Sequence, residues 1–304
     1  MEPTLAVYRF LKEKVTFLYH QLKLFAFEKT IGRTLALPII ATITLALYKQ
    51  TQNIATKKAI GNDFSPPCSY KTLVVNMHRY ALIALLVLTR ILYPNRSHAH
   101  LVKHTDATDI PVCLHKNAKS HKTMQGLAQW GHSGKGHYYG IKLHLASDLK
   151  RQLLAIRFSP ANTHGTKTFL RLNKDLDGIF IADAEFLSQK PQYAFHREHR
   201  RLLFAQPRKN MKKLITAFHY HLYNTRMLIE LNFRNLKLFF GLVTSLPRSI
   251  NGYVANYVYS ILAYALRQRS YVNTFSFINT EFFKTRASVG LFGMIPVSGL
   301  WRVS

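Results

Sequence analysis

The stretch YYGIKLHLAS (residues 138–147) has the composition of a β-strand, because aromatic and aliphatic residues dominate it. Three further strand-like runs are TDIPVCL (108–114), LLAIRFS (153–159) and GIFIADA (178–184). A loop and then a helix are expected over residues 159–176, between the third and fourth runs. Long helical patterns follow at about 211–240 and at 251–268. This order of elements predicts an α/β domain with a mixed sheet flanked by helices.

The chain before this domain, residues 1 to about 100, is predicted to be all-helical. Residues 5–27 alternate apolar and basic positions at helical spacing. Apolar runs at 34–48 and 80–93 are shorter than the roughly 20 residues that cross a bilayer, so buried helices are expected there. A membrane-associated protein stays open as an alternative. Residues 61–69 are predicted to form a loop because they contain two consecutive prolines.

The charge of the chain points to a polyanionic partner. Its 304 residues include 42 Lys plus Arg and only 14 Asp plus Glu, a formal net charge of +28. Cationic side chains release condensed counterions when they contact a nucleic-acid backbone, so nucleic acid is the favoured partner. Two distant cysteines exclude a disulfide framework and a structural zinc site and fit a reducing, intracellular compartment. No P-loop and no G-x-S-x-G motif is present.

Three acids occupy positions where a metal site is chemically sensible. Asp106 precedes the strand-like run at 108–114, and Asp183 lies at the end of the run at 178–184. Glu230 lies on the long helix. Carboxylates hold Mg²⁺, and two such ions stabilise the attacking and leaving oxygens of phosphodiester cleavage. For Glu230, the alternative is a solvent-exposed helix face or an ion pair with Arg226. Three other acids are interpreted as turn residues or helix caps: Asp109, Asp175 and Asp177.

The long helix contains YNTRMLIELNFRNLK, residues 223–237. At about 100° per residue, four polar side chains fall within roughly 60° of one another around the helix. They are Tyr223, Arg226, Glu230 and Lys237. A carboxylate for metal, with an Arg and a Lys for phosphate, is the set that a phosphate-bearing site requires.

In the spacing Y-(2)-R-(3)-E-(6)-K, these four residues resemble the signature of bacterial insertion-sequence transposases with an RNase H-like DDE catalytic domain. Other segments resemble the same family, from about residue 30 to residue 267: TIGRTLALP (30–38), SYKTLVVNMHR (69–79), TDATDIPVC (105–113), KGHYYGIKLHL (135–145), SPANTH (159–164), IADAEFLS (181–188) and PRKNMK (207–212). The resemblance implies an RNase H-like mixed sheet, preceded by the helical region.

The resemblance also implies site residues. Asp106, Asp183 and Glu230 are the implied catalytic acids and ligands of two Mg²⁺ ions, for which Mn²⁺ can substitute. The implied DNA-binding residues are Tyr223, Arg226, Lys237, Lys135, Lys142, Arg208, Lys209 and Lys212. Residues 1–100 form the expected DNA-binding region, residues 101–270 form the catalytic domain, and residues 271–304 form a divergent tail without an assigned role.

The activity implied is cleavage of double-stranded DNA at the element ends, followed by attack of the freed 3′-hydroxyl on target DNA. A homodimer that pairs two ends, a cytoplasmic, nucleoid-associated location and no membrane partner are expected. The chain departs from the family pattern beside the second acid, at Ala182, Ala184 and Glu185. A catalytically decayed transposase that only binds DNA is therefore the alternative.

Overall fold

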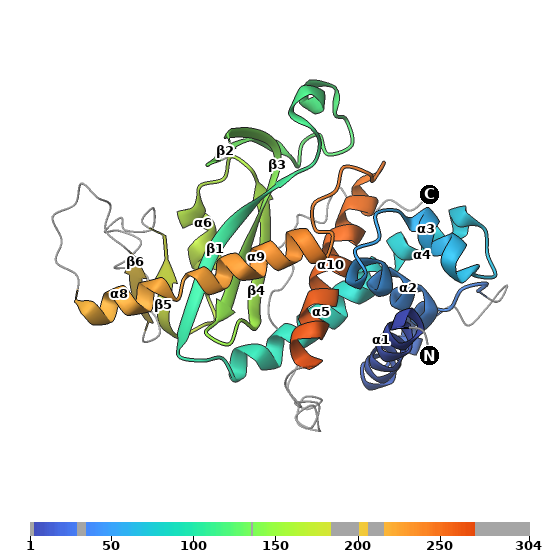
Figure 1. The fold of residues 1–304 in the computed structure, drawn as a ribbon, viewed down its shortest axis with the longest axis horizontal. Coiled ribbons are helices and arrows are strands. Elements are labelled where there is room, and N and C mark those ends of the chain that lie inside the picture. The colour runs from blue at the N-terminus through green and yellow to red at the C-terminus, as the bar shows by residue number, and fades with distance from the viewer. Residues whose placement is uncertain (1–2, 29–34, 135, 184–200, 206–215, 271–304) are drawn as a thin grey trace.

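The computed structural model describes residues 3–28, 35–134, 136–183, 201–205 and 216–270 of the chain. A curled mixed sheet carries helices on both faces, and a helical region formed from the N-terminal part of the chain packs at one end (Figure 1). This architecture confirms the predicted RNase H-like α/β class with an N-terminal helical region.

The sheet has six strands among the described residues, and they pair in the order β2-β3-β1-β5-β6, with β4 also on β3. Their bounds are β1 (Val102–Pro111), β2 (Gln129–Ser133), β3 (Gly136–Asp148), β4 (Leu153–Pro160), β5 (Gly178–Ala182) and β6 (Arg201–Ala205). Strand β3 is antiparallel to β1, β2 and β4. Strands β1, β5 and β6 are parallel, so their carboxyl ends lie at one edge of the sheet.

The helices fall into an N-terminal group and a group that covers the sheet (Figure 1). The first group is α1 (Pro3–Gln21), α2 (Ile39–Thr51), α3 (Lys57–Phe64), α4 (Tyr70–Arg79) and α5 (Ala81–Ser97). The second is α6 (Gly165–Leu172), α8 (Ala217–Asn224), α9 (Met227–Phe239) and α10 (Ile250–Ser270). Short 3₁₀ turns occupy residues 24–27 and 115–120.

Alternation along the strands produces two hydrophobic cores, one on each face of the sheet. Leu143 and Leu145 of β3 belong to the larger core, with residues of α9, α10, α5 and α2. Ala146 belongs to the smaller core, with Phe169 of α6 and Phe180 of β5. The larger core runs without interruption from the sheet into the N-terminal helices, so α10 anchors the helical region to the sheet.

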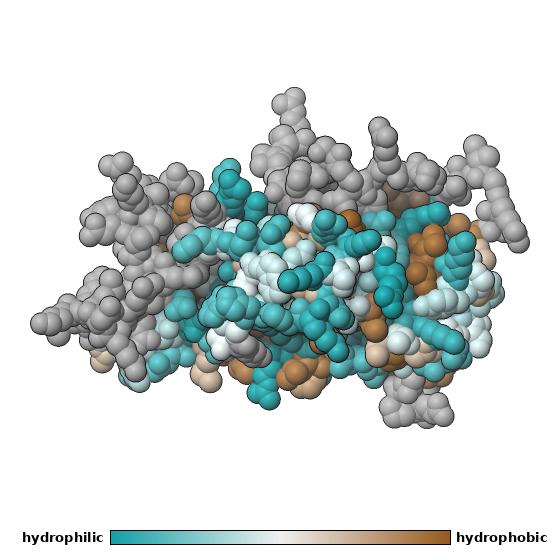
Figure 2. Space-filling model, turned by 90° about the horizontal axis from the view of Figure 1, so that it is seen from above, coloured by the Kyte–Doolittle hydropathy of each residue, from teal (hydrophilic) through white to brown (hydrophobic). Residues whose placement is uncertain are grey.

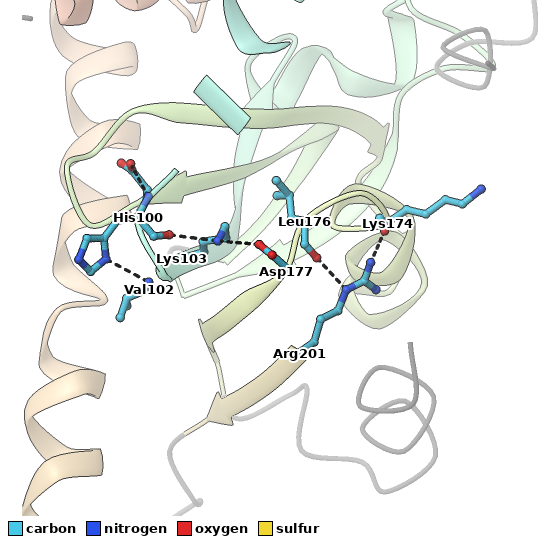
Figure 3. Close-up of polar contacts among 8 residues, drawn as sticks. His100, Val102, Lys103, Lys174, Leu176, Asp177 and Arg201 are labelled. Carbon is cyan, nitrogen blue, oxygen red and sulfur yellow. Dashed lines mark hydrogen bonds and ion pairs between the residues drawn. The ribbon is translucent and has the colours of Figure 1, made fainter. Parts of the chain in front are cut away.

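Hydrogen bonds and an ion pair fix the position of β5 along β1 (Figure 3). Lys103 of β1 is 2% exposed, donates to the carbonyl of His100 at 3.0 Å and pairs with Asp177 at 3.6 Å. The guanidinium of Arg201, on β6, donates to the carbonyls of Leu176 at 2.7 Å and of Lys174. These contacts fasten the turn before β5 to both neighbouring strands, and so fix where β5 begins.

Glycine is required where β5 begins. Gly178 has φ +95°, and a Cβ there would lie 2.4 Å from the carbonyl oxygen of Leu101. Only a residue without a side chain fits both the positive φ and this close approach. The turn therefore delivers β5 into register with β1.

The structure corrects several predicted boundaries. Strand β1 spans Val102–Pro111 instead of 108–114, so Asp106 lies inside the strand and not before it. The predicted long helix is divided into α8 and α9 at Thr225 and Arg226. Helix α3 continues to Phe64, four residues into the predicted loop. Strands β2 and β6 were not predicted, and the divergent tail lies outside the described residues.

One stretch of the described chain, Tyr70–Ser97, is long and apolar enough to cross a membrane by length and composition alone. It combines α4 and α5, and half of its most apolar window is buried inside the protein. Helix α5 packs against α10 and β4, and α4 packs against α2. The core helix of a protein without a membrane span meets the same criteria of length and composition.

Candidate active site

The register of the two central parallel strands brings two predicted acids to one place. His104 of β1 is the partner of Ile181 of β5. Two residues further along both strands are Asp106 and Asp183, and Asp183 directly follows the end of β5. Their charges interact, since Asp183 contributes to the raised pKa of Asp106. The register therefore brings both carboxylates within range of a direct charge interaction.

Asp106 is more enclosed than Glu230. Its side chain is 16% exposed. One oxygen accepts from the backbone N–H of Ala107 at 2.8 Å, and the other accepts from Arg226 at 2.6 Å. Burial raises the pKa of Asp106 to about 6 even though Arg226 and the N–H of Ala107 lower it, and the negative charges of Asp183 and Glu230 raise it further. The site is thus rich enough in carboxylates to favour a cation.

Arg226 supplies the cation in this structure. Its Nη2 lies 2.6 Å from Asp106 Oδ2, and its Nη1 lies 2.6 Å from Glu230 Oε1. Burial alone would lower the pKa of Arg226, but the nearby acids raise it above its ordinary value. The Glu230 side chain is 57% exposed, so the outer end of this bridge is open to solvent. The ion pair between Arg226 and Glu230 is the alternative that the sequence left open for Glu230.

The break between α8 and α9 orients Arg226. The Thr225 hydroxyl donates to the carbonyl of Leu222 at 2.6 Å and lies 2.8 Å from Nε2 of His104. His104 is completely buried on β1, and burial lowers its pKa to about 4, so the ring is neutral at pH 7. Because His104 and Asp106 are two residues apart on one strand, their side chains leave the same face of the sheet. The contact between His104 and Thr225 therefore aligns the helix break with Asp106.

Tyr223 completes the group that surrounds Asp106. Burial raises the pKa of Tyr223, and the charges of Arg226, Asp183, Asp106 and Glu230 all reach its hydroxyl. The structure thus brings together five predicted site residues from β1, β5, α8 and α9. They are Asp106, Asp183, Tyr223, Arg226 and Glu230.

Two other predicted DNA-binding residues lie apart from this group. Lys237 donates to Asp109 at 3.1 Å, and both side chains are 23% exposed. Lys142, which faces Asp109 across β1 and β3, donates to the carbonyl of Thr163 at 3.3 Å. Four further predicted residues, and Glu185, lie outside the described residues: Lys135, Arg208, Lys209 and Lys212.

Some residues that shape the site were not predicted from the sequence. Asp109 was interpreted as a turn residue or cap; that interpretation is wrong, because Asp109 lies in β1 and pairs with Lys237. No pattern predicted the contact between His104 and Thr225, since a contact between a strand and a helix break has no sequence spacing of its own. Asp175, by contrast, lies in a turn, as interpreted from the sequence.

The acids fit a divalent metal in chemistry and in electrostatics. Carboxylate oxygens are the hard ligands that Mg²⁺ and Mn²⁺ prefer. Within the described ranges, no group of three His, Cys, Asp or Glu side chains is arranged to hold a metal ion. The guanidinium of Arg226 instead lies between Asp106 and Glu230. Arg226 is therefore the cation that these two carboxylates share in this structure.

Comparison with known proteins decides the family. A family model described as the transposase DDE domain matches residues 96–249, which is just over half of the chain. The chain belongs to the DDE transposases. The matched segment of this transposase contains β1 to β6, α8 and α9, and therefore all five residues grouped around Asp106.

Solved structures give a looser similarity to the transposase. The piggyBac transposase synaptic complex with hairpin DNA aligns with a TM-score of 0.47 at 9% identity, over 89% of this chain and 76% of that chain. The Mos1 strand transfer complex aligns with a TM-score of 0.24 at 12% identity, over 83% and 84%. The Mos1 mariner paired end complex with Mn also aligns with a TM-score of 0.24 at 12% identity, over 84% of this chain and 87% of that chain. No curated protein matches the chain.

Proposed function

We propose that this transposase cleaves the ends of a bacterial insertion sequence and joins the freed 3′-hydroxyl to target DNA. The observation that carries the proposal is the meeting of three acids from β1, β5 and α9 around one cation. Asp106 and Glu230 share Arg226, and Asp183 lies beside Asp106 on the neighbouring strand. Their order along the chain and the Y-(2)-R-(3)-E-(6)-K spacing support an insertion-sequence origin.

Each residue has a proposed task. Asp106, Asp183 and Glu230 hold two Mg²⁺ ions, or Mn²⁺ in their place. When bound, such ions polarise the phosphoryl oxygens and lower the pKa of water, which supplies a nucleophile and stabilises the leaving oxygen. Arg226 moves from the carboxylates to a DNA phosphate, since its planar fork suits both partners. Tyr223 lies close enough to the acids to contact the DNA end.

DNA is the proposed partner on grounds of charge. The formal net charge of +28 provides affinity for any duplex, because each neutralised phosphate releases counterions. Hydrophilic residues cover much of the described part of the face seen in Figure 2. Lys142, Lys237 and the basic residues outside the described ranges would contact phosphates, and the helices before residue 101 would recognise the element ends. A homodimer would pair two ends, in the cytoplasm and on the nucleoid.

The proposed division of labour follows the chain. Residues 1–100 bind DNA, and residues 101–270 cleave it, while no role is assigned to residues 271–304. Helix α10 belongs to the second part by sequence but packs with α2 and α5 of the first. We therefore expect the two parts to move together on DNA.

Cleavage and strand joining on labelled DNA that carries the element's own ends, with Mg²⁺ or Mn²⁺, test the proposal. The variants are Asp106→Asn, Asp183→Asn and Glu230→Gln. Asp175→Asn is the matched control, since Asp175 is 71% exposed and lies outside the site. We expect the three variants to bind DNA but to lose cutting by at least about 10³-fold, and the control to cut normally. Cutting that persists in any of the three variants would refute the assignment of that acid.

The alternative function is a decayed transposase that only binds DNA. Arg226 favours it, because the guanidinium already satisfies Asp106 and Glu230 without metal. The same assay separates the two functions. Wild-type protein that binds the ends and never cuts or joins them, with either metal, supports the binding-only function.

A further inference from the structure

Three basic side chains meet in the N-terminal helical region, far along the chain from the acids. Lys49 is on the last turn of α2 and is 8% exposed. Lys57 begins α3, and its Nζ lies 2.6 Å from Nε2 of His78 on the last turn of α4. Lys57 and His78 are half-buried, so the group opens to solvent on their side. We call these three residues the basic cluster.

No acid balances the basic cluster in the described part of the chain. None of its three side chains forms an ion pair with a carboxylate there. The only acid between residues 35 and 97 is Asp63, which is at the opposite end of α3 from Lys57. Three buried or half-buried bases without a counter-charge are costly, because burial penalises the charged form of each.

The bases also oppose one another. Burial lowers the pKa of Lys49 to about 8. Burial, and then the charge of Lys49, lowers the pKa of Lys57 to about 8. Burial, and then the charge of Lys57, lowers the pKa of His78 to about 4. At neutral pH the His78 ring is therefore neutral and accepts from Lys57 at 2.6 Å, so the two lysines carry the positive charge of the cluster, and an anion beside them would offset it.

The start of the longest described helix lies beside the cluster. Gly252 is in the first turn of α10, and a Cβ placed there would lie 3.4 Å from Cε1 of His78. The first N–H groups of a helix carry partial positive charge and favour anions. The N–H groups of Gly252 and Tyr253 already donate to Ser249, so it is the positive end of the helix dipole that reaches the cluster at His78.

We propose that the basic cluster binds a phosphate oxyanion, namely a backbone phosphate of the DNA. This inference rests on the proposed function, because it assumes that the protein holds DNA. Helices α3 and α4 lie at the opposite end of the molecule from β5 and β6 (Figure 1). A duplex bound there is therefore gripped well away from the three acids. The contact reads no bases, so it contributes affinity and not sequence preference.

Lys49→Met and Lys57→Met test the cluster, with Lys71→Met as the matched control. Lys71 is exposed on the same helix as His78, and its loss removes the same charge. Affinity for an arbitrary duplex is measured by fluorescence anisotropy at several salt concentrations. Each cluster variant is expected to weaken binding about five- to tenfold and to reduce the salt slope by about 1. The control is expected to change affinity less than about twofold.

Thermal melting of the same variants separates a binding role from a structural one. Replacing a buried, unpaired base by an apolar side chain removes a desolvation penalty, so Lys49→Met is expected to raise the Tm while it weakens DNA binding. A lower Tm with unchanged DNA affinity would overturn the proposal. Affinity of Lys57→Met equal to that of Lys71→Met would overturn it as well.

The His78 ring reports which phosphate is bound. In full-length wild-type protein with labelled histidine, the pKa of His78 is expected to rise when a duplex is added, and to rise less with inorganic phosphate. A response to inorganic phosphate alone would overturn the assignment to DNA. All of these readouts are independent of cleavage. The cleavage assay and these binding assays can therefore fail separately. Wild-type protein that never cuts DNA would count against the proposed function, whereas unchanged DNA affinity in the lysine variants would count against the phosphate site.

Discussion

Arg226 holds Asp106 and Glu230 in one guanidinium fork, with a nitrogen 2.6 Å from an oxygen of each. A single cation thereby joins strand β1 to helix α9 where we propose that DNA is cut. The fork must open before either carboxylate can take a second cation. In the proposed function, Arg226 thus competes with metal in the free protein and binds a phosphate in the DNA complex.

Arg226→Gln should therefore tighten Mn²⁺ binding to the DNA-free protein by about tenfold, equivalent to roughly 1.4 kcal/mol. The same change should lower the free energy of unfolding by about 1–3 kcal/mol, because Asp106 loses its only ion-pair partner in the described structure. Calorimetric titration with Mn²⁺ and denaturant unfolding measure the two effects. Unchanged Mn²⁺ affinity would show that Arg226 does not compete with metal.

Thr225→Val removes the hydroxyl that lies 2.8 Å from Nε2 of His104. The buried ring nitrogen then has no partner, so the free energy of unfolding should fall by about 1–2 kcal/mol. Thr89→Val is the control, because the Thr89 hydroxyl donates to the carbonyl of Leu86 in its own helix, at an exposed position. Urea denaturation measures both variants, and equal effects would contradict a special role for the bond to His104.

Asp109 and Lys237 should show energetic coupling. Their side chains meet at 3.1 Å and are only 23% exposed, so screening by solvent is partial. A double-mutant cycle with Asp109→Asn and Lys237→Met is expected to give about 0.5–1 kcal/mol. The pair Arg96 and Asp175, at 3.7 Å with Asp175 71% exposed, should give a value near zero. Similar coupling in both cycles would contradict this account.

Acid should destabilise the protein through His144. Burial, and then the charges of Lys142 and Arg157, lowers the pKa of His144 to about 4. Between that value and the ordinary value of 6.5, the unfolded chain binds the proton and the folded protein does not, so stability falls as pH falls through this window. The contribution reaches at most about 3 kcal/mol.

The raised pKa of Asp106 increases the stability of the folded protein as the pH falls, which is the opposite of the effect of His144. The contribution of His144 is therefore measured by comparing wild type with a variant. In His144→Gln, the melting temperature should fall less than in wild type between pH 6.5 and pH 4. The glutamine amide would retain a donor for Ser159, whose hydroxyl lies 2.8 Å from the histidine ring. Parallel curves of melting temperature against pH for the two proteins would exclude His144 as the cause.

The sequence predicted the sheet class and the place of Asp183 at the end of a strand, because both depend on local patterns. The run at 138–147 became the long central strand β3, and Asp183 follows β5 as expected. Strand β6 was not predicted, since a five-residue strand depends on pairing with β5 and not on its own pattern. The break at Thr225 was also missed, because a strand residue, His104, helps to set it.

The single helix face predicted for Tyr223 to Lys237 shows the same limit. Arg226 and Glu230 share a face as the spacing requires, and both reach toward Asp106. Lys237, two turns further on, meets Asp109 instead. Periodicity gives the direction of a side chain, but only the tertiary structure decides what lies opposite it.

The central claim is that Asp106, Asp183 and Glu230 hold metal, and Mn²⁺ binding tests it most directly. Calorimetry and Mn²⁺ electron paramagnetic resonance would compare wild type with Asp106→Asn, Asp183→Asn and Glu230→Gln, and with Asp175→Asn as control. The account predicts that wild type and the control bind Mn²⁺ alike and that each of the three variants loses most of the binding. Wild-type binding in any of the three variants would contradict it.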